Sequence, residues 1–374
     1  MDQATSPAKP RILVAPLDWG LGHATRCIPL ISALTRMGCN VLLAGEDKTA
    51  RLLSEEFPHL PLIPLEGYRV RYARSGWELA LTITSQIPRI ISAIEKEKEW
   101  LDSIVEEHSI DAVISDNRYG LFHEKVPTIF ITHQLLIKTG TGKWGDEFLQ
   151  GINYQYIQQF GACWVPDHEG EDNLAGDLSH PAEKPAIPLR YIGPLSRFEP
   201  GEKREEKHLL VMLSGPEPQR TIFEDLLLEQ LQSYNGPIVF VRGLPGGQEQ
   251  PDHPSHILMH NHLPAAALKQ VMEEASLVIA RCGYSTVMDL AALRKKSILV
   301  PTPGQTEQSY LSEHLMKKGF ALCAAQDKFR LTNLLELSGQ FNYQLPQVSS
   351  SADLEEALEE FVGKLGRGDR QPRG

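Results

Sequence analysis

The loop Asp18-Trp-Gly-Leu-Gly-His-Ala-Thr-Arg26 joins an apolar run to a helical pattern and holds residue types that catalysis uses. Gly20 and Gly22 allow the backbone to approach a ligand closely, and the following helix offers unpaired N–H groups at the positive end of its dipole. His23 stands at this turn, and because its reference pKa lies near neutrality it could serve as a base or a donor. A tight turn with a capping histidine explains the same spacing, so both interpretations stay open.

Two loops in the second half of the chain carry groups that suit a diphosphate. Ser214 and Gly215 follow an apolar run and can present hydroxyl and N–H donors to a phosphate, although a rigid proline-containing turn fits as well. The later loop combines a cation, a small residue and two hydroxyls at a helix start: Arg281, Gly283, Ser285 and Thr286. Asp289 lies three residues after Thr286, a spacing that also predicts a capping box with Asp in place of Glu.

Acidic and amide side chains complete the candidates. Asp116 follows the strand predicted at Ala112–Ser115 and is a second candidate base, unless it closes that strand with an Asx turn. Glu307 and Gln308 head a helical pattern, where they can hydrogen-bond sugar hydroxyls or simply complement the helix dipole. Thr132-His-Gln134 ends another predicted strand on the side expected for an acceptor. No Asp-x-Asp triplet occurs in the chain, so nothing in the sequence indicates a metal that bridges a diphosphate.

These loops must be held by elements that alternate between strand and helix. Runs of Val, Ile and Leu without polar alternation are typical of parallel strands covered on both faces. The predicted strands are Ile12–Pro16, Val41–Ala44, Pro61–Leu65, Ala112–Ser115, Thr128–Thr132 and Cys163–Pro166 in the first half, and Leu209–Leu213, Ile238–Val241, Ile257–His260, Leu277–Ala280, Ile298–Pro301 and Ala321–Ala324 in the second. The predicted helices are Ala24–Met37, Ile94–Glu107, Ile222–Gln232, Ala265–Glu274, Val287–Arg294, Gln308–Lys317 and Asp353–Lys364.

The alternation predicts an α/β protein built from two doubly wound, parallel-sheet domains. A stretch rich in turn residues and charge near 194–207 predicts a hinge, which divides the chain into domains of residues 1–195 and 205–374. Ligands of open α/β sheets bind beyond the carboxyl ends of the strands. We therefore expect a cleft between the domains, with the candidate loops facing it.

Composition limits the classes of function. The 374 residues include 37 Lys plus Arg and 48 Asp plus Glu, and this net charge of −11 argues against bulk binding of nucleic acid. Five cysteines without CxxC spacing fit reduced thiols in a cytoplasmic protein better than a zinc ribbon or a disulfide scaffold. The beginning MDQATSPAKP has no apolar core typical of a signal peptide, and no stretch reaches the roughly 18 apolar residues of a membrane span.

The stretch Ala280–Ala321 resembles the C-terminal signature of the family-28 glycosyltransferases, which include the N-acetylglucosaminyltransferase of peptidoglycan-precursor synthesis. The matching residues are Arg281, Gly283, Thr286, Asp289, Pro301, Gln308 and Gly319. Proteins of this family have the GT-B fold, in which two Rossmann-like domains enclose an interdomain cleft. Cys282, Asp289 and Ser312 stand where Ser, Glu and Asn are common in the family.

This resemblance implies a UDP-sugar donor bound by the C-terminal domain, with no other cofactor. A second family loop, matched by Ser214 and Gly215, approaches the phosphates. The implied positions along the ligand are His262 and Leu263 at the base, Asp289 at the ribose, Arg281, Gly283 and Thr286 near the diphosphate, and Glu307 and Gln308 at the donor sugar.

The loop Gly20–Cys27 resembles the Gly-rich acceptor-side loop of the same family. It resembles even more closely the GxGHxxRC loop of the nucleotide-sugar hydrolases of pseudaminic acid synthesis, in which the histidine is the proposed catalytic group. We expect an inverting, metal-independent transfer of a hexose or N-acetylhexosamine from a UDP-sugar to an acceptor hydroxyl, with His23 or Asp116 as the base. The alternatives are a UDP-sugar hydrolase of that type and a GT-B protein that binds a nucleotide without turnover.

The sequence leaves the acceptor and the oligomeric state open, and both a soluble sugar and a lipid-linked acceptor fit. Gly67–Ile94 mixes arginines with aromatic and aliphatic residues, among them Arg69, Arg71, Tyr72 and Arg74. Such a mixture suits peripheral contact with an anionic membrane or a lipid-linked acceptor, but a core helix with a basic rim fits it better. We therefore expect a cytoplasmic protein, with peripheral contact at the inner face of the membrane as a further expectation.

Overall fold

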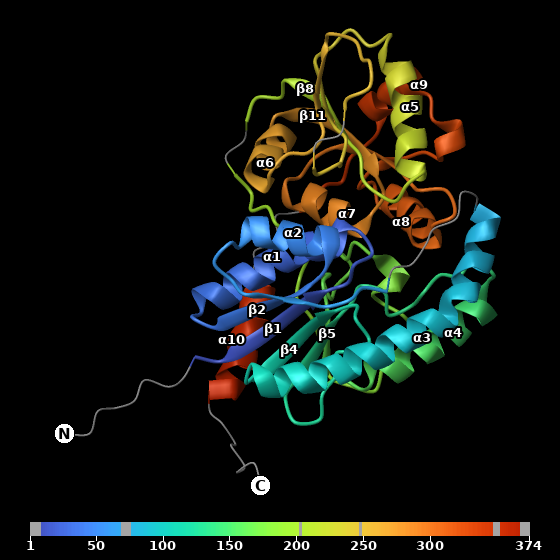
Figure 1. Cartoon of the computed structure of the whole chain (residues 1–374). Helices are drawn as coiled ribbons and strands as arrows, with labels where there is room; N and C mark the ends of the chain where they lie inside the picture. Colours follow the sequence, from blue (N-terminus) through green and yellow to red (C-terminus); the bar gives the residue numbers. More distant parts are fainter. Residues whose placement is uncertain (1–8, 69–75, 202–203, 247–248, 347–351, 367–374) are drawn as a thin grey trace.

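A computed structural model describes residues 9–68, 76–201, 204–246, 249–346 and 352–366, with the backbone alone for residues 76–87 and 366. Two parallel sheets, each covered by helices, form two lobes that lie against each other (Figure 1). This confirms the predicted fold class. Arg69, Arg71, Tyr72 and Arg74 lie outside the described residues, so the predicted membrane-facing segment has no structural test here.

The first sheet has seven strands in the order β3-β2-β1-β4-β5-β6-β7. Its strands are β1 (Arg11–Pro16), β2 (Asn40–Gly45), β3 (Leu62–Pro64), β4 (Ala112–Asp116), β5 (Thr128–Ile131), β6 (Ala162–Val165) and β7 (Leu189–Tyr191). From β1 to β3 the chain adds strands on one side of β1, and from β4 to β7 it adds them on the other side. The direction in which strands are added therefore reverses between β1 and β4. That reversal opens a crevice at the carboxyl ends of these two strands.

The second sheet repeats the winding of the first with six strands in the order β10-β9-β8-β11-β12-β13. Its strands are β8 (His208–Met212), β9 (Ile238–Val241), β10 (Ile257–His260), β11 (Ala275–Arg281), β12 (Ser297–Val300) and β13 (Leu322–Cys323). The order reverses between β8 and β11. Each predicted strand therefore has a counterpart in the structure, and β7 is an addition.

Helices cover both faces of each sheet. They are α1 (Leu21–Arg36), α2 (Asp47–Glu56), α3 (Gly76–Glu107), α4 (Lys143–Ile157), α5 (Gln219–Leu231), α6 (Ala265–Glu273), α7 (Tyr284–Ala292), α8 (Thr306–Lys317), α9 (Leu331–Gln340) and α10 (Ala352–Gly366). Alternate strand residues face opposite helices: in β1, Ile12 shares a core cluster with α1, whereas Leu13 shares one with α3. Within the described chain, no helix combines the length and apolarity that crossing a bilayer requires.

The last helix, α10, returns to the first domain. Phe361 meets the ring of Trp164 edge-on at 5.7 Å between centroids, and Glu360 pairs with Arg190 of β7. Figure 1 shows α10 within the lobe of the first sheet, away from the strands of the second sheet, and α10 also contacts α1. The sheets fall within the predicted ranges 1–195 and 205–374, but the chain joins the two domains twice.

Helix α1 begins at Leu21, three residues earlier than its sequence pattern predicts. Gly20 precedes it with a φ of 93°, a backbone conformation that favours glycine. His23 consequently lies within the first turn of the helix and not in the connection before it. The earlier start matters because it places His23 and Arg26 on one helical face.

Candidate active site

His23, Arg26 and Asp116 meet at the carboxyl end of the first sheet. β1 and β4 pair with Pro16 opposite Asp116, the last residue of β4. Arg26 donates from Nε to Oδ2 of Asp116 at 2.8 Å and from Nη2 to Oδ1 of the same carboxylate. Nδ1 of His23 lies 3.3 Å from Oδ2 of Asp116 and 3.0 Å from Nη2 of Arg26. The three side chains form one buried cluster at the crevice where the strand order reverses.

The carboxylate of Asp116 is held ionised. Its side chain is 1% exposed, and burial alone would raise its pKa. The charge of Arg26, with the hydrogen bonds from His23 and Arg26, outweighs burial and holds the pKa of Asp116 well below its usual range. A carboxylate of such low basicity is a poor proton acceptor. Asp116 therefore orients its neighbours, and the geometry favours His23 between the two candidate bases.

His23 is the member of the cluster that reaches open space, with 17% of its side chain exposed. Burial and then the charge of Arg26 lower the pKa of His23 below 6.5, although Asp116 opposes them. The imidazole is therefore neutral at neutral pH. Nδ1 of His23 contacts both Asp116 and Arg26: accepting from Arg26 places the ring proton on Nε2, whereas in the tautomer whose Nδ1–H donates to Asp116 the bare Nε2 can accept a proton.

The N-termini of α1 and α7 face each other across the cleft. Ser285 donates its hydroxyl to the backbone oxygen of Gly22 at 2.9 Å. A Cβ at Gly22 would lie 2.8 Å from that hydroxyl, so glycine permits this close approach. The helices follow Gly20 and Gly283, and neither end has a side-chain cap in the described structure. Two sets of unpaired N–H groups and two positive dipole ends thus converge, as an anion requires.

A second contact crosses the cleft at Glu307, in the first turn of α8. Its carboxylate accepts from Nε2 of Gln134 at 2.6 Å and lies 2.8 Å from Nε2 of His133, directly after β5. The ring of His133 lies flat against Tyr284, with centroids 4.1 Å apart, and its Nδ1 is 3.1 Å from Nη1 of Arg26. Burial would raise the pKa of Glu307, but the hydrogen bond from His133 and the nearby charge of Arg26 keep it below its usual value.

The loops after β8 and β12 lie close together beyond the ends of these strands. Gly215 has a φ of 103° and is exposed, and the neighbouring Ser214 is half-buried. Thr302 is 2% exposed, and its hydroxyl has no hydrogen-bond partner among the described residues. A Cβ at Gly215 would lie 3.9 Å from that hydroxyl. Thr302 was not singled out from sequence, because a threonine in a Pro-x-Pro turn resembles an ordinary turn residue.

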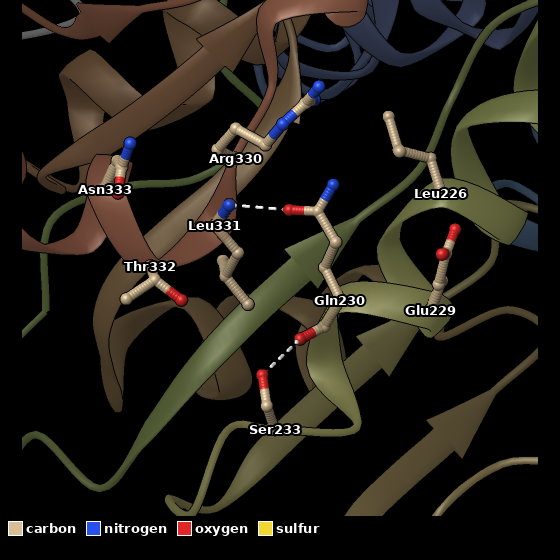
Figure 2. Close-up of a pocket in the computed structure, with 8 residues that line it drawn as sticks. All are labelled: Leu226, Glu229, Gln230, Ser233, Arg330, Leu331, Thr332 and Asn333. Atoms are coloured by element: carbon tan, nitrogen blue, oxygen red, sulfur yellow. Dashed lines mark hydrogen bonds between the residues drawn. The ribbon is translucent and has the colours of Figure 1, made fainter.

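A separate depression of about 730 Å³ lies between α5 and α9 (Figure 2). Its lining residues are Leu226, Glu229, Gln230, Ser233, Arg330, Leu331, Thr332 and Asn333. Figure 2 shows Gln230 accepting from the backbone N–H of Leu331 at 2.6 Å and Ser233 donating to the Gln230 carbonyl at 3.1 Å. These contacts cap and join two helices, and none of the candidate residues lies there.

Known proteins match this chain in two ways. Residues 257–357 match the model described as "Glycosyltransferase family 28 C-terminal domain". Over 78 residues the chain is 40% identical to the UDP-N-acetylglucosamine--N-acetylmuramyl-(pentapeptide) pyrophosphoryl-undecaprenol N-acetylglucosamine transferase of Rhodopseudomonas palustris (strain BisB18). That match covers 20% of this chain and 20% of the relative, so it spans about a fifth of either protein.

Solved structures match nearly the whole chain at low sequence identity. The glycotransferase of kitacinnamycin has a TM-score of 0.62 and 15% identity, covering 97% of this chain and 95% of that one. Glycosyltransferase SsfS6 of Streptomyces sp. SF2575, complexed with thymidine diphosphate, has a TM-score of 0.57 and 16% identity, covering 94% and 99%. The chain has the GT-B fold, and residues 257–357 are similar to the family-28 C-terminal domain.

Arg281, the cation of the family-28 signature, is buried in this GT-B protein, with 1% exposure. Its guanidinium lies 4.2 Å above the ring of Phe223. Nη2 donates to the backbone oxygen of Gln219 and to Oε1 of Gln326, both at 2.7 Å. Burial lowers the pKa of Arg281 to about 10. Its side chain therefore braces the start of α5, and any effect on a diphosphate would pass through the loops that it fixes.

Asp289 and Gln308 of the same signature also have protein partners. Asp289 accepts from Oγ of Ser196 at 2.8 Å and from Nε of Arg197 at 3.3 Å, and burial raises its pKa. Oε1 of Gln308 accepts from the backbone N–H of Thr302 at 2.9 Å. α7 begins before Thr286, so the capping box considered for Thr286 and Asp289 does not form. Their positions at a ribose and a donor sugar stay predictions.

The remaining signature residues lie along the cleft side of the GT-B second domain. Thr286 is half-buried beside Ser285 in the first turn of α7. His262 and Leu263 are half-buried between β10 and α6, and burial lowers the pKa of His262. Their contacts with a nucleotide base stay predictions.

Arg26 lies at the centre of the site but was not among the candidates from sequence, and His133 was included only within Thr132–Gln134, on the side expected for an acceptor. Arg26 lies three residues after His23, a spacing that places both on one helical face. His133 lies just beyond the carboxyl end of β5, where such folds place ligand-binding residues. The helical spacing alone could have indicated Arg26, whereas the pairing of His133 with Glu307 depends on how the domains meet.

Proposed function

We propose that this protein is a glycosyltransferase that moves a hexose or N-acetylhexosamine from a UDP-sugar to an acceptor hydroxyl. The observation that carries the proposal is His23, held by Asp116 beside the facing N-termini of α1 and α7. A neutral base and an anion-binding surface thus lie within one turn of each other. The relative named for UDP-N-acetylglucosamine and the neighbour complexed with thymidine diphosphate support a nucleoside-diphosphate donor.

The chemistry that this arrangement suits is a single displacement. The acceptor hydroxyl gives its proton to Nε2 of His23, and its oxygen forms a bond to the anomeric carbon from the face opposite the nucleotide. The bond from that carbon to the diphosphate breaks, its electron pair leaves with UDP, and the anomeric configuration inverts. Asp116 stabilises the imidazolium. The ends of α1 and α7 stabilise the departing charge, so the proposed transfer needs no metal ion.

The function is tested by measuring release of UDP from UDP-glucose and UDP-N-acetylglucosamine with and without a panel of acceptor alcohols. We expect at least a tenfold higher rate of release with the right acceptor, because the base at His23 acts on the acceptor hydroxyl. The measurement is repeated after removal of divalent cations with EDTA, which we expect to leave the rate unchanged. No binding of either donor by calorimetry, together with no release, would contradict the proposal.

A hydrolase is the second candidate, and one observation favours it. Arg26 and Cys27, which match the hydrolase-like loop together with His23, all contact the same carboxylate of Asp116; the Cys27 Sγ is 3.7 Å from Oδ2. Burial raises the pKa of the Cys27 thiol, so it is not a nucleophile. In a hydrolase, His23 would activate water instead of an alcohol. Release of UDP at full rate without any acceptor would favour this candidate.

The acceptor side of the protein carries an exposed apolar stripe on α4. Trp144 is 88% exposed, Phe148 is 70% exposed and Ile152 is 37% exposed, and their spacing of four residues places them on one face. The loop that leads into α4 reaches the second domain, since a Cβ at Gly140 would lie 3.1 Å from a methyl carbon of Thr306. A stripe that starts at the cleft and leads away from it suits an acceptor with an apolar part.

Replacing both aromatic residues tests this acceptor class. The variant Trp144→Ser/Phe148→Ser should raise KM for an acceptor that carries an alkyl chain by roughly tenfold or more, because aromatic side chains contribute about 1.5–3 kcal/mol each when buried by a ligand. We expect no change in UDP affinity or melting temperature. Leu337→Ser, at an exposed position of α9, is the control. Equal KM values for alkyl and short polar acceptors in the wild type would contradict the apolar assignment.

A further inference from the structure

The contact between Glu307 and the first domain is unusual for a residue assigned to the donor side. Glu307 belongs to α8 of the second domain, but the two partners that the structure describes for its carboxylate, His133 and Gln134, follow β5 of the first. Oε1 of Glu307 faces His133, and Oε2 faces Gln134. An ionised carboxylate can accept about four hydrogen bonds, so two sites stay available to sugar hydroxyls.

Arg26 fixes the proton on His133. A guanidinium only donates hydrogen bonds, so the contact of 3.1 Å between Nη1 of Arg26 and Nδ1 of His133 requires Nδ1 to be the bare nitrogen. The proton of the neutral ring then lies on Nε2, which donates to Oε1 of Glu307 at 2.8 Å. Stacking against Tyr284 fixes the plane of the ring. A buried side chain of α1 thus determines how a carboxylate of the other domain is oriented.

We propose that His133 and Gln134 are positioning residues that complete the donor-sugar site by orienting Glu307 from the opposite domain. This inference rests on the proposed function, in which Glu307 faces the sugar of the donor. It follows that the base and ribose of the nucleotide are bound by the second domain, whereas the sugar is recognised only when both domains meet. Recognition of the sugar and closure of the cleft are then the same event.

The test compares affinities for UDP and for UDP-glucose and UDP-N-acetylglucosamine by calorimetry. In His133→Ala we expect the advantage of the UDP-sugar over UDP to fall roughly tenfold, with UDP affinity changed less than twofold. His133→Gln should restore most of the advantage, because its amide N–H can replace Nε2–H. Gln134→Ala should give a smaller loss. In Glu307→Gln, adding His133→Ala should cause no further loss, since both changes remove one interaction.

The outcomes distinguish a failure of this inference from a failure of the proposed function on which it rests. If the wild type binds neither UDP nor the UDP-sugars, the proposed function fails and the inference fails with it. If the wild type prefers a UDP-sugar and His133→Ala keeps that preference, the inference alone is wrong. A general structural defect would lower both affinities together, which also overturns it.

A second measurement needs no ligand. In ¹⁵N NMR of the histidine-labelled wild type, the signals of His133 should be those of a neutral ring with its proton on Nε2. In Arg26→Gln the constraint on the tautomer is relaxed, and we expect the two nitrogen shifts to move toward each other. A wild-type ring protonated on Nδ1 would overturn the proposed orientation of Glu307.

Discussion

Replacing His23 with alanine is expected to lower kcat by about 10²–10⁴-fold, the usual contribution of a positioned general base. UDP affinity should change little, because the N–H groups at the ends of α1 and α7 belong to the backbone. The measurement is steady-state transfer at saturating donor, with calorimetry of UDP binding beside it. His59→Ala, at an exposed position, is the control. A kcat within threefold of the wild type would remove His23 from the mechanism.

The pH profile gives the same assignment a second test. The base must be neutral, so activity is lost as the pH falls through the pKa of His23. Burial and Arg26 lower that pKa, and we therefore expect the acidic limb of kcat/KM below pH 6.5. An acidic limb of kcat/KM well above pH 6.5 would indicate that a group other than His23 is the base.

Replacing Arg26 with methionine should lower the free energy of unfolding of the first domain by about 3–5 kcal/mol, the usual cost of leaving one partner of a buried ion pair without the other. Arg26 and Asp116 are 2% and 1% exposed, so water cannot take the place of the lost guanidinium. All five tryptophans, at positions 19, 77, 100, 144 and 164, lie in the first domain. Tryptophan fluorescence during urea unfolding therefore reports on this domain by itself.

Two further variants test whether the loss of stability comes from the ion pair between Arg26 and Asp116. Arg36→Met removes an exposed arginine of the same helix, paired with Glu355, and should change stability by no more than about 0.5 kcal/mol. Arg26→Met/Asp116→Asn removes both charges and should recover much of the loss. A single Arg26→Met variant as stable as Arg36→Met would contradict the role of the buried pair.

The buried pair also determines how the domain responds to acid. The pKa of Asp116 is lower in the folded protein than its ordinary value of about 3.9. Its contribution to stability is therefore complete above that value and is lost as the pH falls toward the folded pKa. In the double variant this part of the acid response should be absent.

The sequence predicts the parts of this molecule that depend on neighbouring residues. Apolar runs predict every strand through β6 and from β8 to β13, because parallel strands covered on both faces need continuous apolar side chains. The same logic places Asp116 and Ser214 at strand ends, where the structure has them. β7 was missed because Leu189–Tyr191 is short and half-buried at the sheet edge.

What the sequence could not predict depends on contacts between distant parts of the chain. Glu307 and His133 are 174 positions apart, and only the meeting of the domains pairs them. Arg281 and Asp289 match a signature, but the signature does not show whether their side chains contact a ligand or the protein. Arg281 contacts the start of α5, and Asp289 contacts Ser196 in the segment between the domains. α4 begins at Lys143 inside a stretch rich in glycine and threonine, where the local pattern favours a loop.

The return of α10 has a mechanical consequence. The polypeptide passes between the lobes once near residues 192–207 and again before Ala352. Two connections restrict the relative movement of two bodies more than one connection does. We therefore expect the second connection to favour the return of His133 to Glu307 whenever the domains separate.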